Sequence, residues 1–239
     1  PMNRTNIYHF DIKASNILYK NNNIKIIDFG EIGIVDKKNY IPDILFNRSV
    51  QFNTPFSRLI FNDYFMFNIE KILSQTNFTK LNNNNIVNIV KYSYEEYINR
   101  YNLGHELFLG DYLLPKIFAL IPKNMVKSIT KNYTDNMSII KDWIINYCSA
   151  VIIKFYDFKI KKFDRIKFFN EVYSKNVDIY GIITCYIQYI TTDNTNYSNK
   201  LKIHISQLLL EYCFNYEYAI KPYNISTIIN KLLLLNNIK

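Results

Sequence analysis

The chain has 239 residues, of which 49% are hydrophobic and 16% aromatic, so it can bury one substantial core and form one or two domains. Only 5 Gly and 6 Pro are present, which argues against a β-sandwich with many tight turns and favours helices. The net charge of +9 is compatible with nucleic acid, an anionic membrane or phosphorylated ligands, but the Lys and Arg residues are scattered.

The distribution of cysteines and apolar residues indicates where the protein resides. Cys148, Cys185 and Cys213 form neither a CxxC pair nor a zinc-binding spacing, so free thiols in a reducing compartment are expected. No signal peptide is visible, and the longest uncharged apolar stretches, 143–153 and 179–190, are shorter than the roughly 20 residues of a spanning helix. We therefore expect a soluble, cytoplasmic protein that does not bind membranes.

The first predicted element is a β-hairpin. Two short β-rich runs, 16–19 and 24–27, flank an Asn-rich turn at 20–23, and Asn accepts left-handed backbone angles. Asp11, Lys13 and Asn16 come at or before the start of the first strand, and Asp28 follows the second. In an antiparallel pair these two points lie at the same end. The hairpin is therefore expected to bring the four side chains together.

The remainder of the chain is predicted to be a loop followed by helices. The segment 31–56 has little periodicity, carries a polar run at 36–39 and is expected to be a long ordered loop, a kind that is usually functional when it is not disordered. From residue 58 onward the apolar spacing becomes helical. The expected helices are 58–75, 84–101, 107–121 with an interruption at Pro115, 135–155 capped by Asp135 or Asn136, 165–173, 177–190, 201–215 and 225–235.

The densest basic run, 154–167, is interleaved with Phe, Ile and Asp. An amphipathic helix with a solvated basic face is the expected structure. The alternative is a nucleic-acid-binding surface, because aromatic side chains among basic ones can stack on bases. Three other residues receive plain structural interpretations. Trp143 is expected in the core, His204 on a helix surface, and His105 in a surface or cap role because no second His completes an HExxH zinc motif.

Two segments carry a known pattern: HFDIKASN at positions 9–16, which we call the polar loop, and DFG at positions 28–30. Together they resemble the catalytic loop and metal-binding segment of eukaryotic protein kinases, H-R-D-L-x-x-x-N followed by D-F-G. The order, the hairpin between the two parts and the apolar lead-in Ile26-Ile27 also match. The resemblance implies a mainly α-helical fold, a protein-kinase-like C-lobe with a short catalytic β-hairpin near the N-terminus and a long helical insertion.

The resemblance also implies chemical roles. Asp11 would accept the proton of the substrate hydroxyl, and Lys13 would contact the transferring phosphate of ATP. Asn16 and Asp28 would hold Mg²⁺, a hard cation that prefers oxygen ligands. A Lys two residues after the Asp resembles serine/threonine kinases rather than tyrosine kinases, and it argues against aminoglycoside or choline kinase relatives.

Other positions in the two segments would shape the site. By the same resemblance, Leu18 and Ile27 would line the adenine pocket and so belong, with Lys13, to the ATP-binding residues. His9 and Phe29 would be packing residues that hold the loop.

A second match lies at 176–190, NVDIYGIITCYIQYI, which resembles the buried C-lobe helix whose Asp anchors the catalytic-loop backbone. It would make Asp178 such an anchor, and a helix N-cap is the alternative for this residue. Near the end of the chain, Lys221-Pro222-Tyr223 and the apolar run 225–233 look like the last helices of the family, where Arg-Pro usually stands.

The chain departs from the family pattern at several positions. Phe10 replaces the Arg that in many kinases grips a phosphorylated activation loop, which puts that switch in doubt, although Ser49 and Thr54 are candidate phosphorylation sites. Phe56 stands where the Glu of Ala-Pro-Glu is expected, and Lys221 replaces its Arg partner. The double loss is coherent because a buried charge without its partner would be costly.

The separation of Gly30 from Asp178 is much longer than is usual in the family, so a helical insertion is expected at about 62–175. The whole chain, 1–239, is then expected to be a C-lobe without its N-lobe, because no Gly-rich loop, strand Lys or helix Glu precedes Tyr8. Such a fragment is expected to bind ATP poorly by itself.

The predicted function is that of an ATP-dependent serine/threonine protein kinase that uses Mg²⁺ and transfers the γ-phosphate to a protein hydroxyl. Its expected partners are ATP, a protein substrate and a protein bound through the insertion. The alternative is a pseudokinase or interaction scaffold without catalysis. Nucleic acid is not expected as a partner, although binding by the basic insertion is a weaker third hypothesis.

Overall fold

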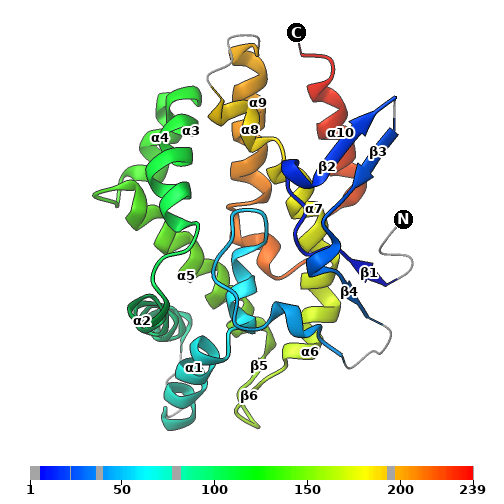
Figure 1. Ribbon diagram of the computed structural model, residues 1–239. Coiled ribbons are helices and arrows are strands. Elements are labelled where there is room, and N and C mark those ends of the chain that lie inside the picture. The colour runs from blue at the N-terminus through cyan, green and yellow to red at the C-terminus, as the bar shows by residue number, and fades with distance from the viewer. Residues whose placement is uncertain (1–5, 22, 36–39, 77–81, 193–196, 239) are drawn as a thin grey trace.

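The computed structural model describes residues 6–21, 23–35, 40–76, 82–192 and 197–238. Asn22 of the predicted turn and the polar run 36–39 lie outside the described residues. The described chain is mainly helical, as expected, and its strands form three two-stranded antiparallel sheets. Figure 1 shows α1–α4 on one side of the molecule and the β2–β3 hairpin on the other.

The described α-helices are α1 (Asp63–Gln75), α2 (Asn83–Tyr101), α3 (Leu114–Leu120), α4 (Lys123–Thr130), α5 (Asn136–Phe155), α6 (Arg165–Phe168), α7 (Ser174–Thr184), α8 (Ile187–Thr191), α9 (Asn199–Tyr212) and α10 (Ile225–Leu235). The sheets pair β1 (Ile7–Tyr8) with β4 (Gly33–Ile34), β2 (Ile17–Lys20) with β3 (Asn23–Ile26), and β5 (Tyr156–Asp157) with β6 (Lys162–Phe163). Short 3₁₀ turns lie at Ala14–Asn16, Phe29–Glu31, Asp43–Leu45, Phe56–Phe61 and Tyr216–Ala219, and π turns at Phe108–Leu113 and Phe169–Tyr173.

Helices with strong periodicity and clear caps agree with the prediction. The range of α10 is the one predicted, and α2 starts one residue earlier than predicted. Asp135 is the N-cap of α5, because its carboxylate accepts the backbone N–H of Ser138 at 2.7 Å. The helix predicted from residue 58 starts later, at Asp63, where Asn62 accepts the N–H of Phe65 at 2.9 Å.

Three parts of the prediction need correction. The predicted helix 107–121 consists of a π turn followed by α3, with Pro115 in the first turn of α3. The helix predicted at 177–190 begins at Ser174 and is broken between α7 and α8. Helix α4 and the small β1–β4 sheet were not predicted, since each is too short to show a periodic pattern.

The basic run 154–167 does not form the expected amphipathic helix. Helix α5 ends at Phe155, and the strands β5 and β6 follow as a hairpin. The Asp157 carboxylate accepts the backbone N–H groups of Lys159 at 2.8 Å and Ile160 at 3.2 Å, and Lys161 has a φ of 54°. An Asp side chain that satisfies backbone donors locally competes with helix formation, so a turn forms here.

The core of the described residues is one hydrophobic cluster that extends from Tyr8 to Leu235. Helix α5 packs against α2, against the 3₁₀ turn Phe56–Phe61 and against the turn Tyr216–Ala219. Cys148 and Cys213 are buried and Cys185 is half-buried, all as free thiols, in agreement with the sequence.

None of the helices in the described ranges combines the length and apolar character that a membrane crossing requires.

Candidate functional site

The backbone of the polar loop is held by Asp178. The Asp178 carboxylate accepts the backbone N–H of His9, 3.2 Å from either oxygen, and the backbone N–H of Phe10 at 3.1 Å. Asp178 lies inside α7 rather than at its N-cap, so the N-cap alternative is wrong and the anchoring contact is present. Burial raises the pKa of Asp178, while the two backbone N–H groups act in the opposite direction.

Phe10 has an unusual backbone conformation, with a φ of 59° that non-glycine residues rarely adopt. Its ring is buried and stacks against Tyr8 at 5.8 Å between centroids. Together with the Asp178 contact, this packing keeps the chain in the strained conformation immediately before Asp11. The apolar residue at this position therefore has a packing role in the structure.

The Asp11 carboxylate lies where three donors converge. Lys13 Nζ donates to Oδ2 at 2.7 Å, Asn16 Nδ2 to Oδ2 at 3.2 Å, and Asn53 Nδ2 to Oδ1 at 2.8 Å. Burial alone would raise the pKa of Asp11, but the hydrogen bonds from Lys13 and Asn53 outweigh it and hold the pKa below its usual value. Asp11 is therefore an ionised, oriented carboxylate at neutral pH.

Asn53 was missed by the sequence analysis. It is 2% exposed, and its Nδ2 also contacts the carbonyl oxygen of Ile12 at 3.2 Å. It lies in the segment 31–56, whose lack of periodicity gave no indication of which residue would turn inward. Only the fold brings it to Asp11, 42 residues earlier in the chain.

The hairpin forms as predicted and brings the backbone of Asn16 beside that of Ile27, the residue before Asp28. The N–H of Ile27 donates to the carbonyl of Asn16 at 2.9 Å. Asn21 in the turn has a φ of 52°, the left-handed angle expected for Asn. His9 is fully buried, with Nε2 3.0 Å from the carbonyl oxygen of Ile27, and it fastens the loop to the hairpin.

Asn16 and Asp28 each carry an oxygen of the kind that Mg²⁺ prefers as a ligand. The amide nitrogen of Asn16 is used by Asp11, which leaves Oδ1 as an acceptor with only the Ser15 hydroxyl at 3.5 Å. Asp28 is exposed, and its carboxylate forms no hydrogen bond or ion pair with another described residue. Mg²⁺ is often bound through one or two carboxylates plus waters and substrate phosphates. Within the described ranges no group of three or more His, Cys, Asp or Glu could hold a metal instead.

Leu18 and Ile27 lie on the same face of the hairpin. Leu18 pairs with Lys25 in the register, and Ile27 follows Lys25 by two residues, which returns its side chain to that face. Leu18 is 50% exposed, so its side chain is accessible to a ligand. That these two residues line an adenine pocket stays a prediction. Phe29 is also half exposed, with its ring 5.4 Å from that of His9.

A buried arginine joins the segments on either side of the site. Arg58 is 1% exposed and donates to Gln51 Oε1 at 2.7 Å and Glu31 Oε2 at 3.2 Å, with a longer contact of 3.5 Å to the carbonyl of Phe10. Arg48 forms an ion pair with the other oxygen of Glu31 at 2.8 Å. Pairing of this kind makes a buried charge tolerable. From the sequence, Arg58 was expected only at the start of a helix.

Phe56, at the position where the resemblance to protein kinases leads us to expect a Glu, makes aromatic contacts. Phe56 is buried, stacks on Phe214 at 6.0 Å and meets the ring of Tyr147 edge-on at 5.8 Å. Lys221 instead forms an exposed ion pair with Glu217 at 2.7 Å. The two replacements therefore do not interact with each other, in agreement with the loss of that salt bridge.

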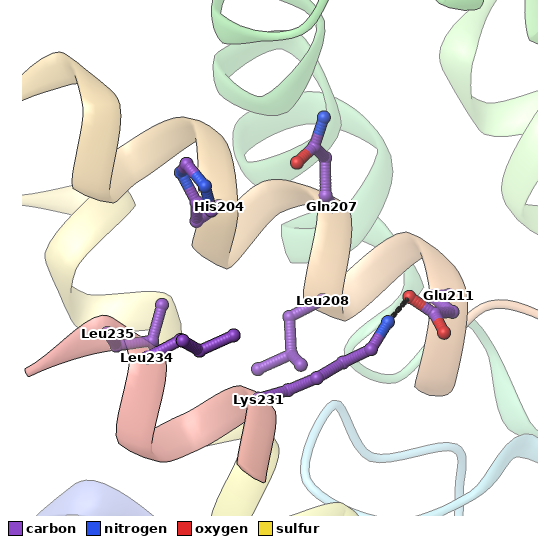
Figure 2. Close-up of a pocket in the computed structure, with 7 residues that line it drawn as sticks. All are labelled: His204, Gln207, Leu208, Glu211, Lys231, Leu234 and Leu235. Atoms are coloured by element: carbon purple, nitrogen blue, oxygen red, sulfur yellow. Dashed lines mark hydrogen bonds and ion pairs between the residues drawn. The ribbon is translucent and has the colours of Figure 1, made fainter. Parts of the chain in front are cut away.

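The pockets of the described residues include two of about 490 Å³, one beside the β5–β6 hairpin and one between α1 and α2, and two of about 190 Å³. One of the two smaller pockets lies beside the polar loop and is lined by residues that include Lys13, Ser15, Phe52, Phe108, Cys185 and Gln188. The other lies between α9 and α10, where Lys231 pairs with Glu211 across the opening (Figure 2). His204 borders this second pocket from the surface of α9, as expected. Of these four pockets, the one beside the polar loop is the one lined by polar-loop residues, so it is the candidate site.

No protein-family model matches the chain, and neither the curated proteins nor the solved structures include a match. Any functional assignment therefore rests on the residues of the chain and their geometry.

Proposed function

We propose that the chain is a protein-kinase-like C-lobe that takes part in ATP-dependent phosphoryl transfer to a serine or threonine hydroxyl of a protein. The observation that carries the proposal is the Asp11 carboxylate, ionised and oriented by Lys13, Asn16 and Asn53. The Asp178 anchor beneath it supports the proposal, because a proton acceptor must be held in place to be effective.

In this reaction the substrate hydroxyl oxygen bonds to the γ-phosphorus of ATP, the bond to the leaving ADP oxygen breaks, and Asp11 accepts the hydroxyl proton. Lys13 would contribute a positive charge beside the transferring phosphate, and its side chain is about one-third exposed. Asn16 and Asp28 would hold Mg²⁺, which when bound neutralises charge on the phosphates.

The pocket beside the polar loop supports a macromolecular acceptor. Its lining combines the charged Lys13 with apolar rings and uncharged polar groups, and it is an open pocket rather than a closed small-molecule cage. An extended peptide can place a hydroxyl at Asp11 while neighbouring side chains occupy such an open pocket.

The test is phosphate transfer from labelled ATP with Mg²⁺ to general acceptor proteins such as casein, at an ATP concentration that saturates the protein, because weak ATP binding is expected. Asp11→Asn removes the proton acceptor with little change in shape, so turnover is expected to fall by about 10²–10⁴-fold. The midpoint of urea unfolding and the affinity for Mg²⁺–ATP should be retained. Asp111→Asn, at an exposed carboxylate in the π turn before α3, is the matched control and should keep full activity.

Unchanged turnover in Asp11→Asn would refute the assigned role. A wild-type protein that binds Mg²⁺–ATP but transfers no phosphate would overturn the enzymatic proposal and favour the pseudokinase or scaffold alternative.

A further inference from the structure

A short piece of the expected insertion docks on the segment that carries Asn53. The N–H of His105 donates to the carbonyl of Val50 at 3.2 Å, and the N–H of Phe52 donates to Nδ1 of His105 at 3.2 Å. The rings of His105 and Phe52 lie 5.2 Å apart at 32°. Gly104 permits this approach, because a Cβ there would lie only 2.7 Å from the Val50 carbonyl oxygen.

This docking pairs backbone groups of an irregular segment. The side chains of Gln51 and Asn53 are held by Arg58 and Asp11, whereas His105 pairs the backbone carbonyl of Val50 and the backbone N–H of Phe52. Fixing a loop backbone costs entropy, so each hydrogen bond to it narrows the conformations that the loop adopts. The contacts of His105 therefore help to fix where Phe52 lies, and with it the next residue, Asn53.

The state of the His105 ring follows from the same contact. Nδ1 can accept the Phe52 N–H only when it carries no proton, so a neutral ring has its hydrogen on Nε2. Burial lowers the pKa of His105, and the charge of Lys13 acts in the same direction while that of Asp11 opposes it. The ring is thus near enough to the Asp11–Lys13 pair to interact with it electrostatically.

We propose that His105 is a positioning residue for the phosphoryl transfer: it holds Phe52, which orients the Asn53 amide and through it the Asp11 carboxylate. The last link is the hydrogen bond from Asn53 Nδ2 to Asp11 Oδ1 at 2.8 Å. This gives the expected insertion a defined task, which is to brace the proton acceptor from outside the polar loop. The inference rests on the proposed function for its catalytic consequence only.

The test uses two variants that separate the ring from the acceptor. His105→Phe keeps an aromatic ring against Phe52 but removes the acceptor, and His105→Asn keeps an oxygen near the place of Nδ1 but removes the ring. Asn53→Ala is the reference, because it deletes the hydrogen bond to Asp11 directly. His204→Phe, at an exposed histidine on α9, is the matched control.

The first readout is the pKa of the Asp11 carboxyl group, measured by NMR on the protein without ATP. Asn53→Ala should raise this pKa, because a hydrogen bond to the carboxylate is lost. His105→Phe should also raise the pKa of Asp11, and the Phe52 amide should exchange its hydrogen faster. His105→Asn should restore most of the wild-type pKa and exchange rate. Adding His105→Phe to Asn53→Ala should cause no further shift, because the two changes act along one path.

The second readout is kinetic. His105→Phe should lower kcat by at least about tenfold with little change in KM for ATP, because misorientation of a catalytic group affects the chemical step. If His105→Phe is unfolded, His105→Ala at the same partly exposed position replaces it.

An Asp11 pKa and a Phe52 exchange rate equal to wild type in a folded His105→Phe protein would overturn the inference. Absence of phosphate transfer by the wild-type protein would refute the proposed function instead, and the NMR readouts would still decide whether His105 positions Asp11.

Discussion

Two residues of the candidate site have backbone angles that are strained for side chains other than glycine. Phe10 and Asp28, on either side of the hairpin, have φ angles of 59° and 62°, which cost energy in residues other than glycine. The anchor Asp178, the buried His9 and the buried Arg58 lie around these two positions. The chemistry expected of Asp11 and Asp28 thus depends on neighbours that take no part in it.

Glu106, next to His105, is a second buried carboxylate and gives a pH prediction. It is 0% exposed, Tyr94 donates to Oε1 at 3.0 Å, and Oε2 has no hydrogen-bond partner among the described residues. Burial raises its pKa from the ordinary 4.5. The folded protein then binds the proton more tightly than the unfolded chain, so this group's contribution to stability is complete below pH 4.5 and is lost as the pH rises through the folded-state pKa.

The free energy of unfolding in urea, measured from pH 4 to pH 8, checks this sign. Glu106→Gln cannot titrate, so its stability should not show this loss as the pH rises. Glu95→Gln, at an exposed position of the same helix as Tyr94, serves as the control and should follow the wild type. Parallel curves for wild type and Glu106→Gln would contradict the prediction.

At the level of elements, α7 is the platform of the polar loop. Asp178 anchors the loop, and Gly181, one turn later, lets the loop lie directly on the helix. A Cβ at Gly181 would be 2.6 Å from the carbonyl oxygen of Ile12, and Ile12 is the residue after Asp11. Gly181 and Asp178 thus together hold the polar loop: Gly181 lets the loop backbone pack closely on α7, and Asp178 accepts hydrogen bonds from it.

Gly181→Ala should therefore displace the loop. An alanine normally stabilises a helix interior by about 0.5–1 kcal/mol relative to glycine, so a net loss of about 1–3 kcal/mol would reveal the clash with the Ile12 backbone. Urea unfolding measures the stability, and phosphate transfer should fall with it. Gly30→Ala is the steric control for stability, because its nearest atom, Asp28 Oδ1, would be 3.5 Å away. A Gly181→Ala protein as stable as wild type would disprove the close approach.

At the scale of the whole molecule, the expected insertion and the remaining helices share one core. Helix α5 lies within the predicted insertion, yet it packs on the turn Phe56–Phe61 before it and on the turn Tyr216–Ala219 near the end of the chain. The buried cluster is continuous across these elements. Because apolar burial is shared, removing the insertion would expose the core of the rest.

A shared core predicts a single unfolding transition. Trp143, the only tryptophan, lies on α5 with its ring 5.0 Å from that of Phe214, which follows α9. Its fluorescence should report the same urea midpoint as far-UV circular dichroism, because neither part can unfold without the other. Unfolding of Trp143→Phe, measured by circular dichroism alone, should have the same urea midpoint as the wild type. This control tests that the tryptophan itself does not determine the midpoint. Two separated midpoints would show that the insertion unfolds independently.

Much of the fold and the central part of the site were predictable. The hairpin, the N-cap of α5 and the bounds of α10 follow from local spacing, and the approach of Asn16 to the residue before Asp28 follows from the hairpin alone. Asp178 was expected from a resemblance of its own segment. The run 154–167 was predicted wrongly because the turn formed by Asp157 competes with the helical pattern around it.

The sequence by itself determined the local pieces of this protein, since helix periodicity, capping and hairpin register depend on residues within a few positions of each other. Only the tertiary structure decided that Asn53 and Arg58 meet the polar loop and that His105 meets the segment that carries Asn53. Those contacts join positions about 40 to 55 apart in the chain. They form because a shared hydrophobic core brings separate segments together and leaves their polar groups to pair where they meet, which no local pattern records.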